Sequence, residues 1–130
     1  MMSKKILVVD DDEAIREVIK SCLEELAAWE VLLAASGLEG LRIANSEPLD
    51  AILLDISMPE MNGIEMLRKL QENYPAREIP VFLLTGRVLS GDRQPFLQLP
   101  QVVGVIVKPF NAIKLVEQVA HCLGWKLEFL

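Results

Sequence analysis

Hydrophobic residues occur along this chain in five short blocks that predict five buried strands. Each block is mostly aliphatic and often β-branched, and polar residues, glycine or proline flank it. Runs of this kind are typical of parallel strands that are covered on both faces of a sheet. The predicted strands are Ile6–Val9, Glu30–Ala35, Ala51–Leu54, Val81–Leu84 and Val102–Val107.

Between these blocks the apolar spacing changes to that of amphipathic helices. From Glu13 to Ala27 apolar residues recur every three or four positions, and the first turn carries an acidic residue, which the helix dipole favours. A capping box from Ser36 to Glu39 predicts a second helix that continues to about Asn45. The other predicted helices are Ile64–Asn73, a short one at Asp92–Gln98, and Ala112–Leu123 with Asn111 as N-cap and Gly124 as terminator.

The order of the elements, a strand followed by a helix five times over, predicts an α/β fold. Crossover connections between parallel strands are right-handed. The expected architecture is therefore a doubly wound, five-stranded parallel sheet with two helices on one face and three on the other. A chain of 130 residues has room for one such domain, so we expect residues 1–130 to form a single domain.

The charge and the cysteine content narrow the class of partner. A net charge of −6 argues against nucleic-acid binding, which depends on clustered lysine and arginine. No apolar run is long enough to be a signal peptide or a membrane span, so we expect a cytoplasmic protein with no membrane partner. Cys22 and Cys122 show no metal or redox spacing, and we expect reduced thiols with a packing role in helices.

Polar residues follow four of the five strands directly. Asp10 and Asp11 follow the first strand, Asp55 the third, Thr85 the fourth and Lys108 the fifth. Because the carboxyl ends of parallel strands meet at one edge of the sheet, these side chains are expected to share one pocket. The sequence therefore predicts a site with three or four carboxylates, a hydroxyl and an ammonium group.

The charges in this pocket predict its chemistry. Carboxylates about 5 Å apart repel each other by roughly 3 kcal/mol per pair at an effective dielectric constant of about 20. Such a cluster must bind a cation, share a proton or pair with an ammonium group. Mg²⁺ combines one or two carboxylates with water and phosphate oxygens, and Lys108 adds a fixed positive charge. We therefore predict a site for a divalent cation and a phosphoryl group, with Asp12 set apart as the N-cap of the first helix.

Four motifs resemble one known family in their order and spacing. They are Ile6-Leu-Val-Val-Asp-Asp11, Leu53-Leu-Asp-Ile-Ser-Met-Pro59 with Gly63, Thr85-Gly86 and Val107-Lys-Pro-Phe110. Together they resemble the receiver domain of response regulators in two-component signalling, of the chemotaxis-regulator type. The resemblance covers essentially the whole chain and implies a flavodoxin-like (βα)5 fold.

The resemblance also implies a role for each site residue. Asp55 would accept a phosphoryl group from a phosphohistidine on a sensor histidine kinase or a histidine phosphotransfer protein. Mg²⁺, with Mn²⁺ as a substitute, would be held by Asp10, Asp11, Asp55 and the backbone carbonyl of Ser57. Thr85 and Lys108 would contact the phosphoryl oxygens, together with the backbone amides of Ser57 and Gly86. The bond between Lys108 and Pro109 would be cis.

The implied protein promotes its own phosphorylation and dephosphorylation and is not a conventional turnover enzyme. We expect no output domain in this chain, so its signal would pass by altered docking to a downstream protein. Its oligomeric state is left open.

Two features depart from the family pattern. Val105 stands where the family usually carries the tyrosine or phenylalanine that moves inward with the threonine, and the segment from Leu89 to Pro100 is interrupted by prolines. In the family, both positions belong to the face that typically contacts partner proteins. They motivate the alternative of a receiver-fold protein that binds partners independently of phosphorylation, whereas the intact set of acids, threonine and lysine argues against it.

Two other classes fit less well. A phosphatase of the haloacid-dehalogenase type requires a second acid two residues after its nucleophile, and this chain has Ser57 at that position. A flavodoxin-like nucleotide binder requires a glycine-rich phosphate loop after the first strand. This chain has three acids there, which would repel a phosphate without a metal ion. The apolar tail with Trp125, Phe129 and Leu130 either folds back on the first helix or contacts a partner.

Overall fold

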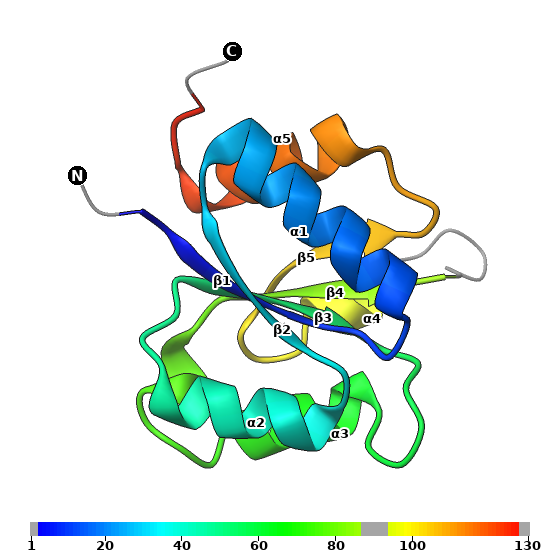
Figure 1. The fold of residues 1–130 in the computed structure, drawn as a ribbon. Coiled ribbons are helices and arrows are strands. Elements are labelled where there is room, and N and C mark those ends of the chain that lie inside the picture. The colour runs from blue at the N-terminus through cyan, green and yellow to red at the C-terminus, as the bar shows by residue number, and fades with distance from the viewer. Residues whose placement is uncertain (1–2, 87–93, 128–130) are drawn as a thin grey trace.

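Five parallel strands form one sheet, in the order β2-β1-β3-β4-β5, in the computed structural model, which describes residues 3–86 and 94–127 (Figure 1). The strands are β1 (Lys5–Val9), β2 (Glu30–Ala34), β3 (Ala51–Asp55), β4 (Val81–Thr85) and β5 (Val102–Val107). The helices are α1 (Glu13–Ala27), α2 (Gly37–Ser46), α3 (Gly63–Leu70), the 3-10 turn η1 (Ala76–Glu78), α4 (Gln94–Leu97) and α5 (Ala112–Leu123). The predicted doubly wound α/β fold is confirmed.

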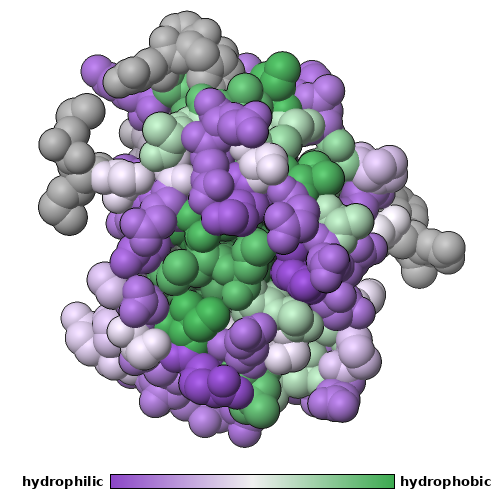
Figure 2. Space-filling model, in the orientation of Figure 1, coloured by the Kyte–Doolittle hydropathy of each residue, from purple (hydrophilic) through white to green (hydrophobic). Residues whose placement is uncertain are grey.

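The sheet is covered on both faces, which explains why its strands are apolar at consecutive positions and polar only at their ends. Helices α1 and α5 pack on one face, while α2, α3 and α4 pack on the other, as predicted (Figure 1). Along β1, Ile6 and Val8 belong to the core under α1 and α5, and Leu7 and Val9 belong to the core over α2 and α3. Strand β2 lies at one edge of the sheet, and an apolar area reaches the surface over it, between α1 and α2 (Figure 2).

Most of the helices start at the predicted residues, where a side chain caps the first turn. Asp12 accepts a hydrogen bond from the backbone N–H of Ile15, and Asn111 accepts one from that of Lys114. Gly124 ends α5 with a φ of 70°, in the left-handed region that favours glycine. These contacts confirm the boundaries predicted for α1 and α5.

The capping box predicted for α2 is only half formed. Ser36 caps the N–H of Glu39 as expected, but the Glu39 carboxylate accepts its hydrogen bond from Ala35 and not from Ser36. The reciprocal capping box occurs instead at α3, between Asn62 and Glu65, and the helix begins at Gly63, one residue before its predicted start at Ile64. The Asn-Gly pair that indicates a turn therefore also serves here as the start of a helix.

Helix α3 ends at Leu70, three residues earlier than predicted. The backbone N–H groups of Glu72 and Asn73 bond to carbonyls three residues back, so the chain tightens into turns before Pro75. A residue before proline disfavours the helical region, which agrees with an early end. Helix α4 is short, as predicted, although its expected start at Asp92 lies outside the described residues.

The C-terminal segment folds back onto the end of α1. The ring of Trp125 packs edge-to-face on Trp29, with ring centroids 5.1 Å apart, and the ammonium nitrogen of Lys4 lies 5.0 Å from the Trp125 ring centroid. Phe129 and Leu130 lie outside the described residues. This contact confirms the fold-back interpretation for Trp125.

The two cysteines differ in their surroundings. Cys22 is half-buried against the core, but Cys122 is exposed, so the packing role predicted for Cys122 is wrong. Both are free thiols. Within residues 3–86 and 94–127, no helix combines the length and the hydrophobicity needed to cross a membrane.

Candidate functional site

The carboxyl edge of the sheet brings the predicted polar side chains together. Asp55 and Thr85 are the last residues of β3 and β4, whereas Asp10 and Lys108 directly follow β1 and β5. Asp10, Asp55 and Thr85 are 0%, 4% and 7% exposed, and Asp11 lies exposed beside them. The site therefore has a buried floor and one acid that faces solvent.

Lys108 is the cation of the site. Its Nζ lies 2.8 Å from Oδ2 of Asp10 and 3.2 Å from Oδ1 of Asp55. Its backbone N–H donates to the carbonyl of Thr85 over 2.7 Å, which ties the end of β5 to the end of β4. The Lys108–Pro109 peptide bond is cis, as the resemblance implied.

Three carboxylates lie close together at the site, and two of them, Asp10 and Asp55, share the Lys108 ammonium group. Carboxylate oxygens of Asp10, Asp11 and Asp55 all lie within 4.8 Å of one another. One ammonium group leaves two of these three negative charges unbalanced, so the cluster attracts further positive charge. Oxygen ligands such as closely spaced carboxylates are those that Mg²⁺ prefers, so the residues present fit such an ion.

The environment perturbs both ionisable partners at the centre of the site. Burial and the charge of Asp10 raise the pKa of Asp55, and the opposing effects of Lys108 and of a backbone hydrogen bond from Ser57 do not cancel this shift. Burial alone would lower the pKa of Lys108, but hydrogen bonding and charge from Asp10 and Asp55 prevail and raise it. Lys108 is thus a stable cation, and Asp55 is an unusually basic carboxylate in the metal-free protein.

The N-terminus of α3 packs tightly against Asp55. A Cβ atom added to Gly63 would overlap the backbone carbonyl oxygen of Asp55, and the backbone there leaves no room for it. The N–H of Gly63 donates to the carbonyl of Ile56 over 2.9 Å, which closes the loop after β3. The sequence signals Gly63 only as part of a motif, because a close backbone approach leaves no other trace in a single sequence.

Arg16 also reaches the site, which the sequence did not predict. Its guanidinium Nη1 donates to the backbone carbonyl of Asp10 over 2.8 Å. Asp12, by contrast, caps α1 as predicted and is not among the three clustered acids. The contact was missed because a polar residue one turn into a helix usually faces solvent. The only clue in the sequence was the spacing between Arg16 and Asp10.

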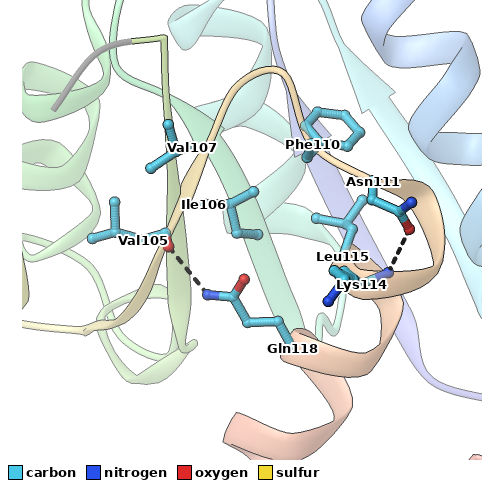
Figure 3. A pocket seen from close by; sticks show the side chains of 8 residues that line it. All are labelled: Val105, Ile106, Val107, Phe110, Asn111, Lys114, Leu115 and Gln118. Atoms are coloured by element: carbon cyan, nitrogen blue, oxygen red, sulfur yellow. Dashed lines mark hydrogen bonds between the residues drawn. The ribbon is translucent and has the colours of Figure 1, made fainter.

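Val105 lies on β5, away from the acids. It is 3% exposed, it pairs with Leu83 of β4, and its carbonyl accepts a hydrogen bond from Nε2 of Gln118 over 3.1 Å (Figure 3). A cavity of about 190 Å³ opens between β5 and α5, beside Phe110 and Leu115 (Figure 3). None of the three clustered acids lines this cavity.

Comparisons with known proteins agree with this geometry. A model of the response regulator receiver domain matches residues 6–120. The polar-differentiation response regulator DivK of Brucella ovis is 30% identical over 123 residues, which cover 95% of this chain and 98% of that protein. The chain therefore belongs to the family of response regulator receiver domains, which act in two-component signalling.

Solved structures show the same fold. A CheY-like response regulator receiver domain protein from Methanospirillum hungatei is 33% identical, with a TM-score of 0.83 and 95% of each chain covered. The receiver domain of a sensor histidine kinase from Pseudomonas aeruginosa is 30% identical, with a TM-score of 0.82 and coverage of 95% of this chain and 99% of that chain. The latter was crystallised with a magnesium ion coordinated in its active-site cleft.

Proposed function

We propose that this receiver domain accepts a phosphoryl group on Asp55 from a phosphohistidine, in a reaction that requires Mg²⁺. The observation that carries the proposal is the position of Lys108, which bridges Asp10 and Asp55 while Asp11 completes a group of three acids. Phosphoryl transfer needs an in-line nucleophile and neutralised charge more than covalent assistance. In this proposal Asp55 is the nucleophile, and Lys108 together with Mg²⁺ neutralises the charge.

In this proposal Asp10, Asp11, Asp55 and the backbone carbonyl of Ser57 hold the metal ion. The carboxylate spacing supports this ligand set, and so does the magnesium ion in the related Pseudomonas aeruginosa domain. Bound Mg²⁺ supplies charge neutralisation for the carboxylates and for the incoming phosphoryl oxygens. Mn²⁺ has similar oxygen chemistry and is the expected substitute.

The protein residues have separate roles in the proposed reaction. A carboxylate oxygen of Asp55 attacks the phosphorus atom, the phosphorus–nitrogen bond of the phosphohistidine breaks, and its electron pair leaves with the imidazole nitrogen, which takes up a proton. Lys108 and the Thr85 hydroxyl donate to the phosphoryl oxygens. Lys108 also opposes the raised pKa of Asp55, because its positive charge and hydrogen bond favour the carboxylate form.

The proposed partners are a sensor histidine kinase or a histidine phosphotransfer protein as donor and a downstream protein as target. The two free thiols agree with a reducing compartment, so the proposal places the protein in the cytoplasm. Loss of the phosphoryl group by hydrolysis returns the protein to its starting state. The domain is thus a self-modifying switch.

The competing proposal is a receiver-fold module that binds partners without being phosphorylated, and Val105 is the observation that favours it. The two proposals differ in one measurement. Purified protein is incubated with acetyl phosphate in Mg²⁺ or in EDTA, and its intact mass is recorded. We expect the mass of one phosphoryl group to be added in Mg²⁺ only. No uptake in either condition would favour the binding module.

A further inference from the structure

The guanidinium group of Arg16 holds the peptide that links two of the clustered acids. Arg16 lies in the second turn of α1, and its Nη1 reaches back to the carbonyl oxygen of Asp10 over 2.8 Å. That oxygen belongs to the peptide plane between Asp10 and Asp11. The hydrogen bond therefore fixes the direction in which the chain leaves β1 and enters the acidic turn.

The two acids joined by this peptide are held very differently. Asp10 is anchored by its own N–H, which donates to Ala34, and by its carboxylate, which accepts from the N–H of Asp12 and from Lys108. For Asp11, no donor among the described residues bonds to the carboxylate, and the side chain is exposed. The position of the Asp11 carboxylate thus depends on its backbone, and the contact with Arg16 restrains that backbone.

Arg16 has two opposing effects on a cation at this site. Its charge repels the cation, whereas its hydrogen bond holds Asp11 within reach of Asp10 and Asp55. The guanidinium group is only partly buried, so solvent and salt screen the repulsion. Groups that orient metal ligands commonly change metal affinity by about 10- to 100-fold. Orientation is therefore the larger effect.

We propose that Arg16 is a positioning residue that sets the Mg²⁺ affinity of the site by fixing the peptide between Asp10 and Asp11. The inference rests on the proposed function, because it concerns the same metal site. Arginine suits this position because it remains charged at all accessible pH values and its planar group donates in a fixed direction. Arg16 does not touch the phosphoryl group in this proposal.

The test compares three variants with the wild type. Arg16→Met removes the donor and the charge while keeping a long apolar stem, and Arg16→Lys keeps a donor and the charge without the planar group. Arg42→Met is the matched control, because Arg42 is an exposed arginine on α2 and belongs to neither the site nor its supports. Far-UV circular dichroism establishes that each variant is folded.

Mg²⁺ alone is titrated into each protein and followed by calorimetry. We expect Arg16→Met to weaken the Kd for Mg²⁺ by roughly 10-fold or more, Arg16→Lys to recover part of the loss, and Arg42→Met to match the wild type. In the reaction with acetyl phosphate, the half-saturating Mg²⁺ concentration should rise by the same factor, while the rate at saturating Mg²⁺ stays unchanged. A merely structural role would not produce this split.

The outcomes separate the two proposals. Unchanged or tighter Mg²⁺ binding in Arg16→Met, with normal binding in the wild type, overturns the role of Arg16 and leaves the proposed function standing. If Arg16→Met does not fold, Arg16→Lys decides, and wild-type affinity together with a wild-type rate profile in that variant overturns the need for the planar group. If neither the wild type nor Arg42→Met binds Mg²⁺, the metal site itself is overturned.

Discussion

The ammonium nitrogen of Lys108 lies 2.8 Å from a carboxylate oxygen of Asp10, although 98 positions separate the two residues in the sequence. Their strands are not neighbours, because β3 and β4 lie between β1 and β5 in the sheet. One lysine therefore spans the carboxyl edge and holds together acids that would otherwise repel each other. The metal-free site depends on this lysine for its stability.

Replacing Lys108 should consequently destabilise the metal-free protein. In Lys108→Met, the buried carboxylates of Asp10 and Asp55 lose a charged hydrogen-bond partner, which typically costs about 1–3 kcal/mol. Urea unfolding in EDTA at neutral pH measures the loss, and added Mg²⁺ should restore part of it. Lys114→Met, on the exposed side of α5, is the control and should unfold like the wild type. Equal unfolding free energies for all three proteins would contradict the account.

Removing the charge of Asp55 should have the opposite effect on stability. The pKa of Asp55 is raised in the folded protein, first by burial and then by the charge of Asp10. A raised folded-state pKa contributes stability that is fully present below the unfolded pKa and is lost as the pH rises through the folded pKa. At neutral pH in EDTA, Asp55→Asn should therefore melt a few degrees higher, the shift that about 1 kcal/mol produces in a domain of this size.

The pH dependence gives this prediction its control. The advantage of Asp55→Asn should shrink as the pH falls through the raised folded pKa of Asp55 and be lost below the unfolded pKa of aspartate, where Asp55 is protonated in both states of the wild type. Melting curves of both proteins from neutral to acidic pH test this. A constant difference across that range would show that the ionisation of Asp55 is not the cause.

Divalent cations should stabilise the fold, because a bound ion relieves the repulsion among the carboxylates. The gain follows RT ln(1 + [L]/Kd), so it should grow steadily at millimolar Mg²⁺ or Mn²⁺. Asp11→Ala should lose most of the metal-induced rise in melting temperature. Asp12→Asn is the matched control, because it removes a neighbouring charge but keeps the N-cap of α1, and its response to metal should be normal. The same response in Asp11→Ala and in the wild type would exclude Asp11 as a ligand.

The sequence predicted the elements well because each strand is a compact apolar block and most caps are local. All five strands fall within one residue of their predicted ends, and the shared edge follows from parallel topology alone. Interactions that depend on the exact path of the backbone were harder to predict from the sequence. The capping box of Asn62 at α3 and the hydrogen bond that the Ala35 N–H donates to Glu39 are examples, because turn residues and acids fit several local arrangements equally well.

The composition of the site was also predictable, but its internal contacts were not. Strand ends indicated that Asp10, Asp55 and Lys108 would meet, yet the sequence could not show that Lys108 bonds to both acids. Arg16 resembled any solvent-facing helix residue, and its contact depends on a long side chain folding back over the preceding turn. The exposure of Cys122 was missed because cysteine is usually buried.

Output should not depend on movement of β5. Val105 is buried beside Leu83, and its carbonyl is tied to Gln118, so this strand offers no aromatic side chain that changes position. We expect beryllofluoride, which mimics the phosphoryl group, to change hydrogen exchange in Gly86–Asp92, most of which lies outside the described residues. The amides of residues 104–106 should keep their protection. Changes centred on residues 104–106, with none in Gly86–Asp92, would refute this expectation.

The central claim, that Asp55 is the phosphoryl acceptor, is tested most directly by chemical mapping of the phosphorylated residue. The protein is phosphorylated with acetyl phosphate and Mg²⁺, then treated with borohydride, which reduces an aspartyl phosphate to homoserine, and the peptides are sequenced by mass spectrometry. The account predicts homoserine at position 55 and none in Asp55→Asn treated in the same way. Homoserine at Asp10 or Asp11, or a phosphoryl group found on another kind of side chain, would contradict it.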